Sequence, residues 1–125
     1  MYSFIQVIRA IRGVFSPDSG LLPATYEYNR ARQEALRKYR RTGHRYYNVW
    51  DPNGRRLVPI TFEGYRGDGD SFQHLRHRGV FSPMSRRELK DGSFYFTPSR
   101  NGAREMEDDV RKQKIDLLRR RYFAR

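Results

Sequence analysis

The chain has 125 residues and carries 26 Lys and Arg side chains against 14 Asp and Glu, a formal net charge of +12 at neutral pH. This charge favours a polyanionic partner, whether RNA, an acidic protein surface or anionic lipid head groups. Cysteine is absent, which excludes disulfides, thiolate catalysis and cysteine-ligated metal sites, and no apolar run approaches the roughly 18 residues of a membrane-spanning helix.

The first predicted element is an amphipathic helix over residues 3–15. Its apolar side chains recur at helical spacing, and residues 1–17 contain no acid. A basic, acid-free amphipathic amino terminus is typical of a mitochondrial targeting segment. An ordinary docking helix explains the same pattern, and both interpretations stay open because a targeting segment can be retained after import.

A second helix is predicted over residues 26–42. Thr25 is its expected N-cap, and Gly43 is its expected C-terminal stop. One stripe of this helix is suited to face a core. The stripe consists of Tyr28, Ala31, Ala35 and Tyr39.

The densest positive patch of the chain lies in and just after the second helix, where Glu34 is the single acid between residues 30 and 45. Arginine forks bind phosphates well, and interleaved tyrosines can stack on bases, so the patch is a candidate RNA-binding surface. A solvated or protein-facing helix surface is the alternative. The patch comprises Arg30, Arg32, Arg37, Lys38, Arg40, Arg41 and Arg45.

A β-hairpin is predicted over residues 46–62, which begin with the stretch YYNVWDPNGRRLVP. Its DPNG turn places Gly54 where a turn needs positive φ. Trp50 lies beside the turn, while Arg55 and Arg56 are expected near the tip, available to acidic groups. Because a two-stranded ribbon is marginal in water, something is expected to cover one of its faces.

Residues 63–100 are predicted to be rich in loops. The glycine-rich stretch GYRGDGDSF lacks both the Lys-Ser/Thr ending of a phosphate-cradling loop and the spaced acids of a calcium loop. His74 and His77 stand three apart without a third ligand, so no metal site is predicted there. A short strand is expected at residues 93–97, after a turn.

The last predicted element is a charged helix over residues 101–123, with Asn101 as its N-cap. Acids lie early and arginines late, which matches the helix dipole at both ends. Pairs of acid and base four apart, such as Asp108 with Lys112, contribute only about 0.2–0.5 kcal/mol each. Because the apolar stripe is imperfect, this helix is expected to lie on a partner's surface rather than in a core.

Together these elements predict a mostly α-helical chain with a short β-hairpin and extended loops, small and non-compact, forming one extended unit over residues 1–125 that its partners order. Leu, Ile, Val and Phe together number 27 of the 125 residues, which is little for an independent core. No base stands beside a candidate nucleophile, so we expect no enzyme activity and no small-molecule substrate.

A leading amphipathic helix with Ile5-Gln6, followed by a tyrosine pair, an aspartate turn, an arginine pair and a proline, resembles the alpha-subcomplex subunit seven family over residues 4–60. These are small basic accessory subunits of mitochondrial respiratory complex I, the NADH:ubiquinone oxidoreductase. Where the family carries a proline-rich linker, this chain has its basic helix. With Trp50 added, the motif gives the predicted partner-binding residues Tyr46, Tyr47, Trp50, Asp51, Arg55, Arg56 and Pro59.

The resemblance implies a non-catalytic subunit without a cofactor. Such a subunit would be bound peripherally on the matrix side of the inner mitochondrial membrane, in contact with other subunits of the complex. The alternative is a mitochondrial ribosomal protein that binds rRNA through its arginine-rich helix. Composition favours the ribosome, whereas the tyrosine motif favours the respiratory complex.

Overall fold

The protein is represented by a computed structural model that describes residues 20–62 and 85–124. The predicted helix at residues 3–15 lies outside the described residues. So do residues 63–84 of the loop-rich segment, including His74 and His77.

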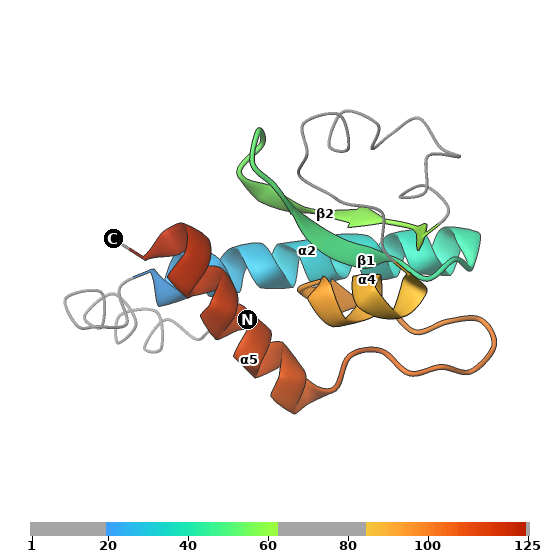
Figure 1. Ribbon diagram of the computed structural model, residues 1–125. Coiled ribbons are helices and arrows are strands. Elements are labelled where there is room, and N and C mark those ends of the chain that lie inside the picture. The colour runs from blue at the N-terminus through green and yellow to red at the C-terminus, as the bar shows by residue number, and fades with distance from the viewer. Residues whose placement is uncertain (1–19, 63–84, 125) are drawn as a thin grey trace, which may run out of the picture.

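The described chain is mostly helical, with a small antiparallel sheet of three strands in the order β2-β1-β3 (Figure 1). The expected mostly helical fold with a short β-hairpin is therefore confirmed, whereas the ordering of the chain by partners stays a prediction. None of the described helices is both long enough and apolar enough to cross a membrane. The elements are α2 (Leu21–Thr42), β1 (Tyr47–Asp51), β2 (Arg56–Ile60), α4 (Arg86–Gly92), β3 (Tyr95–Phe96), α5 (Asp108–Leu118) and the π-helical turn η3 (Arg119–Phe123).

Helix α2 spans the molecule and packs against one face of the sheet (Figure 1). It ends at Gly43 as predicted, where the Gly43 N–H donates to the Tyr39 carbonyl at 2.7 Å and φ is 78°. It starts earlier than predicted, at Leu21, so Thr25 is not its N-cap. The Thr25 hydroxyl instead donates to the Leu21 carbonyl within the first turns. The predicted stripe is confirmed, since Tyr28, Ala31 and Ala35 are buried and Tyr39 packs against the core.

The hairpin register pairs Tyr47 with Ile60 and Asp51 with Arg56. Four residues form the turn, and its positive φ falls on Arg55 (51°) rather than on Gly54, which corrects the predicted turn geometry. The Asp51 carboxylate accepts the Asn53 N–H at 2.9 Å, which stabilises this turn locally.

The outer edge of β2 is closed by side chains of α2. The Leu57 N–H donates to Glu27 Oε2 at 2.6 Å, and the Leu57 carbonyl accepts from Arg30 Nη2 at 3.0 Å. Pro59, two residues on, has no N–H to offer. Exposed strand edges recruit further strands, so this arrangement leaves the edge poorly suited to pairing with another chain.

The opposite face of the sheet carries a second apolar cluster, in which Leu89 of α4 packs with Tyr47, Val49 and Ile60. Helix α4 falls within the segment expected to be loops, which corrects that expectation for its described part. The expected short strand is present as β3, which pairs with β1. Helices therefore cover both faces of β1.

The carboxyl-terminal helix begins at Asp108, with Glu107 rather than Asn101 at its N-cap, so residues 101–107 correct the predicted start. Leu118 is fully buried in the core formed by α2 and the sheet. The Tyr122 ring stacks on Trp50 with centroids 4.1 Å apart and planes at 9°. The expectation that this helix lies only on a partner's surface is thus wrong, because it completes the protein's own core.

Candidate partner-binding surfaces

The predicted partner-binding residues of the hairpin divide into a buried set and an exposed pair. Tyr47 is 1% exposed, Trp50 is 8% exposed and Tyr46 is 9% exposed. Pro59 is buried as well, and Asp51 is half-buried. The four buried side chains are not accessible to a partner, which corrects the expectation that the aromatic residues serve as its anchors.

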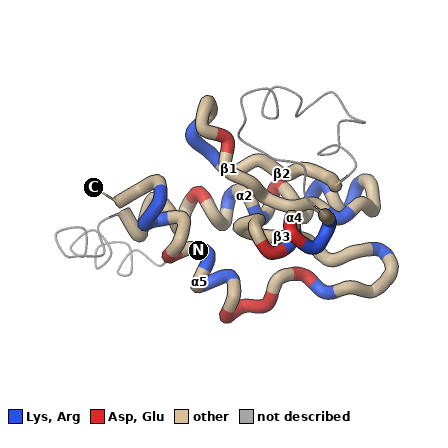
Figure 2. Tube along the Cα trace, in the orientation of Figure 1, with Lys and Arg blue, Asp and Glu red and all other residues tan. Residues whose placement is uncertain are grey.

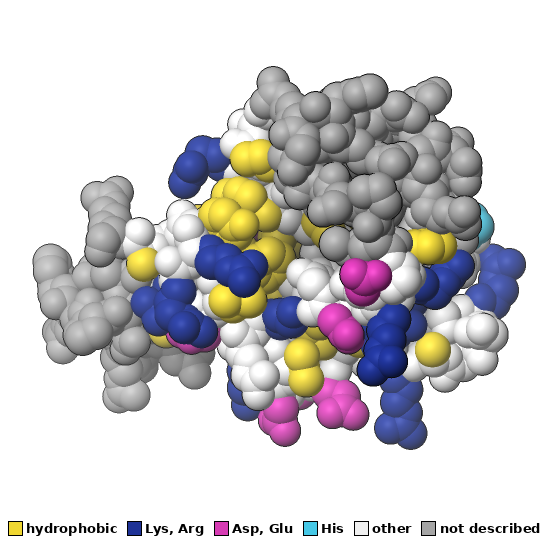
Figure 3. Space-filling view, in the orientation of Figure 1, with side chains coloured by type: hydrophobic (Ala, Val, Ile, Leu, Met, Phe, Trp, Pro, Cys, Tyr) yellow, Lys and Arg dark blue, Asp and Glu magenta, His cyan; other side chains and the backbone are white. Residues whose placement is uncertain are grey.

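The buried aromatic residues bind the hairpin to the rest of the chain instead. The Tyr46 N–H donates to Thr97 Oγ1 at 3.0 Å, and its hydroxyl lies 3.1 Å from Thr42 Oγ1. Trp50 contacts the end of the chain through Tyr122. Figure 3 shows hydrophobic side chains gathered where the hairpin meets the carboxyl-terminal helical segment.

The tip of the hairpin keeps two exposed guanidinium groups, those of Arg55 and Arg56. Arg55 Nη2 makes one long contact, of 3.5 Å, with the Tyr122 carbonyl. Within the described part of the chain, neither arginine forms an ion pair. The tip can therefore offer both charges to an acidic surface.

The predicted basic patch also divides, because Arg30, Arg32 and Arg45 have partners within the protein. Arg30 pairs with Glu27 at 2.6 Å and with Glu34 at 2.8 Å. Its hydrogen bond with Glu27 is the main reason that the pKa of Arg30 is raised. These arginines support the fold and are not free to bind a partner.

Arg45 stabilises the loop that follows β3. Its Nε donates to the Thr97 carbonyl at 2.8 Å, and its Nη2 donates to the Arg104 carbonyl at 2.7 Å. The guanidinium also lies 4.4 Å from the ring centre of Phe96. Lys90 approaches the same ring at 5.3 Å, beside an open groove of about 410 Å³ that Lys114 and Arg104 also line.

The rest of the basic patch lies along the last turns of α2, where Figure 2 shows Lys and Arg positions in blue. Arg37, Arg40 and Arg41 are exposed and Lys38 is half-exposed, and within residues 20–62 and 85–124 none of the four forms an ion pair. No Asp or Glu occurs between residues 35 and 50. This half of the helix therefore carries positive charge that the described chain does not neutralise.

Arg100 adds a further guanidinium to this end of α2, which sequence reasoning missed. Its Nη2 donates to the Thr42 carbonyl at 3.0 Å. Gly43 makes room for it, because a Cβ at that position would overlap the guanidinium. No local pattern links a side chain to a helix end almost sixty residues earlier, so the sequence held no signal for this contact. We call Arg37, Arg40, Arg41 and Arg100 together the α2 arginine face.

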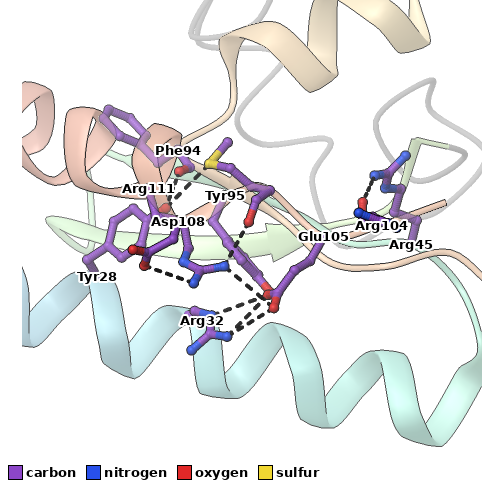
Figure 4. A network of polar contacts seen from close by, with 10 residues as sticks. Tyr28, Arg32, Arg45, Phe94, Tyr95, Arg104, Glu105, Asp108 and Arg111 are labelled. Carbon is purple, nitrogen blue, oxygen red and sulfur yellow. Dashed lines mark hydrogen bonds and ion pairs between the residues drawn. The ribbon is translucent and has the colours of Figure 1, made fainter.

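A network of polar contacts centred on Glu105 joins the carboxyl-terminal segment to α2 and β3 (Figure 4). Glu105 accepts bonds from Tyr95 and from Arg32, the latter at 3.2 Å, and Arg111 lies 3.5 Å away. Arg111 also donates to the Met106 carbonyl and pairs with Asp108. Sequence reasoning missed Glu105, because it lies 73 residues from its partner Arg32.

The electrostatics of this network suit a structural role. Burial opposes ionisation of Glu105, but the hydrogen bond from Tyr95 and the bonds and charges of the two arginines outweigh burial and hold the pKa of this carboxyl below its ordinary value. Burial, together with Glu105, raises the pKa of Tyr95. Neither group is poised to exchange a proton near neutral pH. Among the described residues, no group of three or more His, Asp and Glu side chains is placed to hold a metal ion.

Comparison of the chain with protein-family models, with curated proteins and with solved structures finds no match. The functional argument therefore depends on the exposed arginines of the hairpin tip and of the α2 arginine face.

Proposed function

We propose that this protein is a non-catalytic structural subunit of a large mitochondrial assembly, and that it binds neighbouring subunits through arginines. The observation that carries the proposal is the contrast between two sets of cations. Those near the core, such as Arg30 and Arg32, have acidic partners within the chain. Those at the hairpin tip and on the α2 arginine face have none among the described residues. Unpaired surface arginines of this kind steer and orient a protein on an acidic partner.

Respiratory complex I is the first candidate for the assembly, with the protein bound peripherally on the matrix side. The resemblance over residues 4–60 supports it. Of the motif residues, Arg55 and Arg56 are the exposed pair, so we expect them to contact carboxylates of adjacent subunits. The remaining motif residues would then act indirectly, by holding the hairpin in place.

A mitochondrial ribosomal protein is the second candidate, and the α2 arginine face favours it. Arg37, Arg40 and Arg41 follow one another within about one helical turn, without an intervening acid. This pattern is typical of surfaces that bind nucleic-acid phosphates.

Sedimentation of mitochondrial particles solubilised in mild detergent tests the proposal. The protein should travel with large particles, either with NADH dehydrogenase activity or with rRNA, and RNase should release it only in the second case. Recovery of the whole pool as a free small protein would contradict both candidates. For complex I, the double variant Arg55→Ala/Arg56→Ala should reduce incorporation. The control Lys112→Ala/Arg120→Ala, which removes two cations that pair within α5, should not.

A further inference from the structure

We infer that the α2 arginine face binds the phosphate backbone of a nucleic-acid duplex and makes no stacking contact with bases. The inference rests on the second candidate of the proposed function and narrows it to one kind of ligand and one mode of contact.

The spacing of the cations fits a run of phosphates. Arg40 and Arg41 follow Arg37 by three and four positions, so both lie next to it on one side of α2. They span about 6 Å of the helix axis at 1.5 Å per residue. A duplex carries about one phosphate charge per 1.7 Å of its axis, so several phosphates come within reach of this short segment.

Arg100 is positioned at the carboxyl-terminal end of the same helix. Its bond to the Thr42 carbonyl holds the guanidinium over the negative end of the helix dipole. Without this arginine, the carbonyls at the helix end would repel a phosphate. The αL conformation of Gly43 and its missing Cβ are what permit the contact, so the backbone prepares this cation before any ligand arrives.

The described acid closest in sequence to Arg37 does not neutralise the face. Glu34 precedes Arg37 by three residues, but its carboxylate pairs with Arg30 at 2.8 Å. Within residues 20–62 and 85–124, the positive charge that no acid opposes therefore begins at Arg37 and continues past the end of the helix.

The surroundings of the face do not favour other partners. Single-stranded nucleic acids are bound by exposed aromatic rings that stack on bases, and protein partners are bound by buried aromatic or aliphatic anchors. Among the described residues, the aromatic side chains closest in sequence to Arg37, Arg40 and Arg41 are Tyr39, which packs against the core, and Tyr46, which is buried. The most exposed aromatic residue of α2, Tyr26, lies about three turns before Arg37. A face that offers guanidinium groups, with no exposed aromatic ring beside them among the described residues, fits the phosphate backbone as its ligand.

Fluorescence anisotropy with the full chain tests the inference on four probes. These are a 20-bp duplex RNA, the same duplex as DNA, one strand of the RNA, and polyglutamate. With four cations on phosphates, the logarithm of the binding constant should fall with the logarithm of salt at a slope of about −3.6. Raising the salt from about 50 to 200 mM should then weaken duplex binding about 150-fold.

In the triple variant Arg37→Gln/Arg40→Gln/Arg41→Gln, the slope of the logarithm of the binding constant against the logarithm of salt should become less negative by about 2.7. The matched control Lys112→Gln/Arg120→Gln/Arg121→Gln removes the same formal charge. It should change the slope by less than one, because Lys112 and Arg120 already pair with acids of α5.

Three results would overturn the inference: equal changes in both triple variants, tighter binding of the single strand than of the duplex, or equally tight binding of polyglutamate. Tighter binding of RNA or of DNA duplex would each support backbone contact and would identify which nucleic acid is the source. The sedimentation experiment is independent of these probes. Recovery of the protein outside large particles would reject the structural-subunit role. A negative result in the anisotropy titrations would reject only the duplex as the ligand.

Discussion

Replacing Glu105 with Gln removes one negative charge from the centre of the carboxyl-terminal network while keeping the size of the side chain. The variant Glu105→Gln retains an oxygen that can accept the Tyr95 hydroxyl. It loses the ion pairs with Arg32 at 3.2 Å and with Arg111 at 3.5 Å. Arg32 would then have no acidic partner among the described residues, whereas Arg111 would keep its pair with Asp108 at 3.1 Å.

The expected loss of stability follows from the exposure of these groups. The Glu105 side chain is 30% exposed, Arg32 is 26% exposed and Arg111 is 19% exposed. The pairs are thus intermediate between surface pairs, worth about 0–1 kcal/mol, and fully buried pairs, which cost about 3–5 kcal/mol to break. At about 1 kcal/mol for each pair, the free energy of unfolding should fall by about 2 kcal/mol.

The pH dependence gives this prediction its sharpest test. The folded pKa of Glu105 lies below its ordinary value of 4.5. The carboxylate therefore contributes stability that is fully present above that value and is lost as the pH falls through the folded pKa. Urea denaturation should show a difference of about 2 kcal/mol between wild type and Glu105→Gln at pH 7, and this difference should shrink at pH values below 4.5.

Glu107→Gln is the matched control, because Glu107 is exposed and only two residues away. Its effect should stay within about 0.5 kcal/mol at either pH. Equal stability of wild type and Glu105→Gln at pH 7 would refute the structural role of the network. A difference that persists unchanged into the acid range would refute its electrostatic origin.

Three further substitutions test the outer edge of β2, the packing of the hairpin and the core. Glu27→Gln replaces a charged acceptor of the Leu57 N–H with a neutral one, so we expect a loss of about 1 kcal/mol and more aggregation on light scattering. Tyr122→Ala removes the ring stacked on Trp50, the only tryptophan, so its fluorescence should shift to the red, with a loss of about 3 kcal/mol. Asn48 is fully buried, and its amide finds no partner within the described chain, so Asn48→Leu should stabilise the protein by about 1 kcal/mol.

Each of these three predictions has an outcome that would contradict it. Glu34→Gln is the control for the edge, because Glu34 bonds Arg30 but no strand atom, and equal aggregation of both variants would reject edge protection. An unchanged emission maximum in Tyr122→Ala would mean that the ring does not shield Trp50. A destabilised Asn48→Leu would show that the amide has a partner after all.

The sequence pattern predicted best the features that depend on neighbours along the chain. Helix α2, its buried stripe and its stop at Gly43 all follow from helical spacing and from the αL preference of glycine. Helix α4 was missed although its signal was present. Ser85 and Glu88 form a capping box, in which each side chain bonds the backbone N–H of the other residue.

The accessibility of the hairpin could not be read from the sequence, for a physical reason. A strand with one covered face alternates buried and exposed residues, whereas β1 is buried at each position from Tyr47 to Trp50, because α2 covers one of its faces and α4 the other. The run was compatible with surface anchors for a partner and with a strand buried on both sides. Contacts distant in sequence decide between them: α4 covers Tyr47 and Val49 on one face, and Tyr122 covers Trp50 on the other.

Contacts with distant parts of the chain also explain why the arginines of one helix have two roles. Arg30 and Arg37 are seven residues apart, so helical periodicity places them within about 20° of each other on the same side of α2. Their environments differ because Glu27 and Glu34 flank Arg30, and β2 lies beside it to receive its bond. Arg37 lies one turn beyond the second acid and meets no such partner within the described residues. A cation on this helix therefore stabilises the fold where acids and the sheet edge meet it, and it remains available to a polyanion where they end. It follows that neutralising Arg37 should affect binding much more than stability, and that neutralising Arg30 should do the reverse.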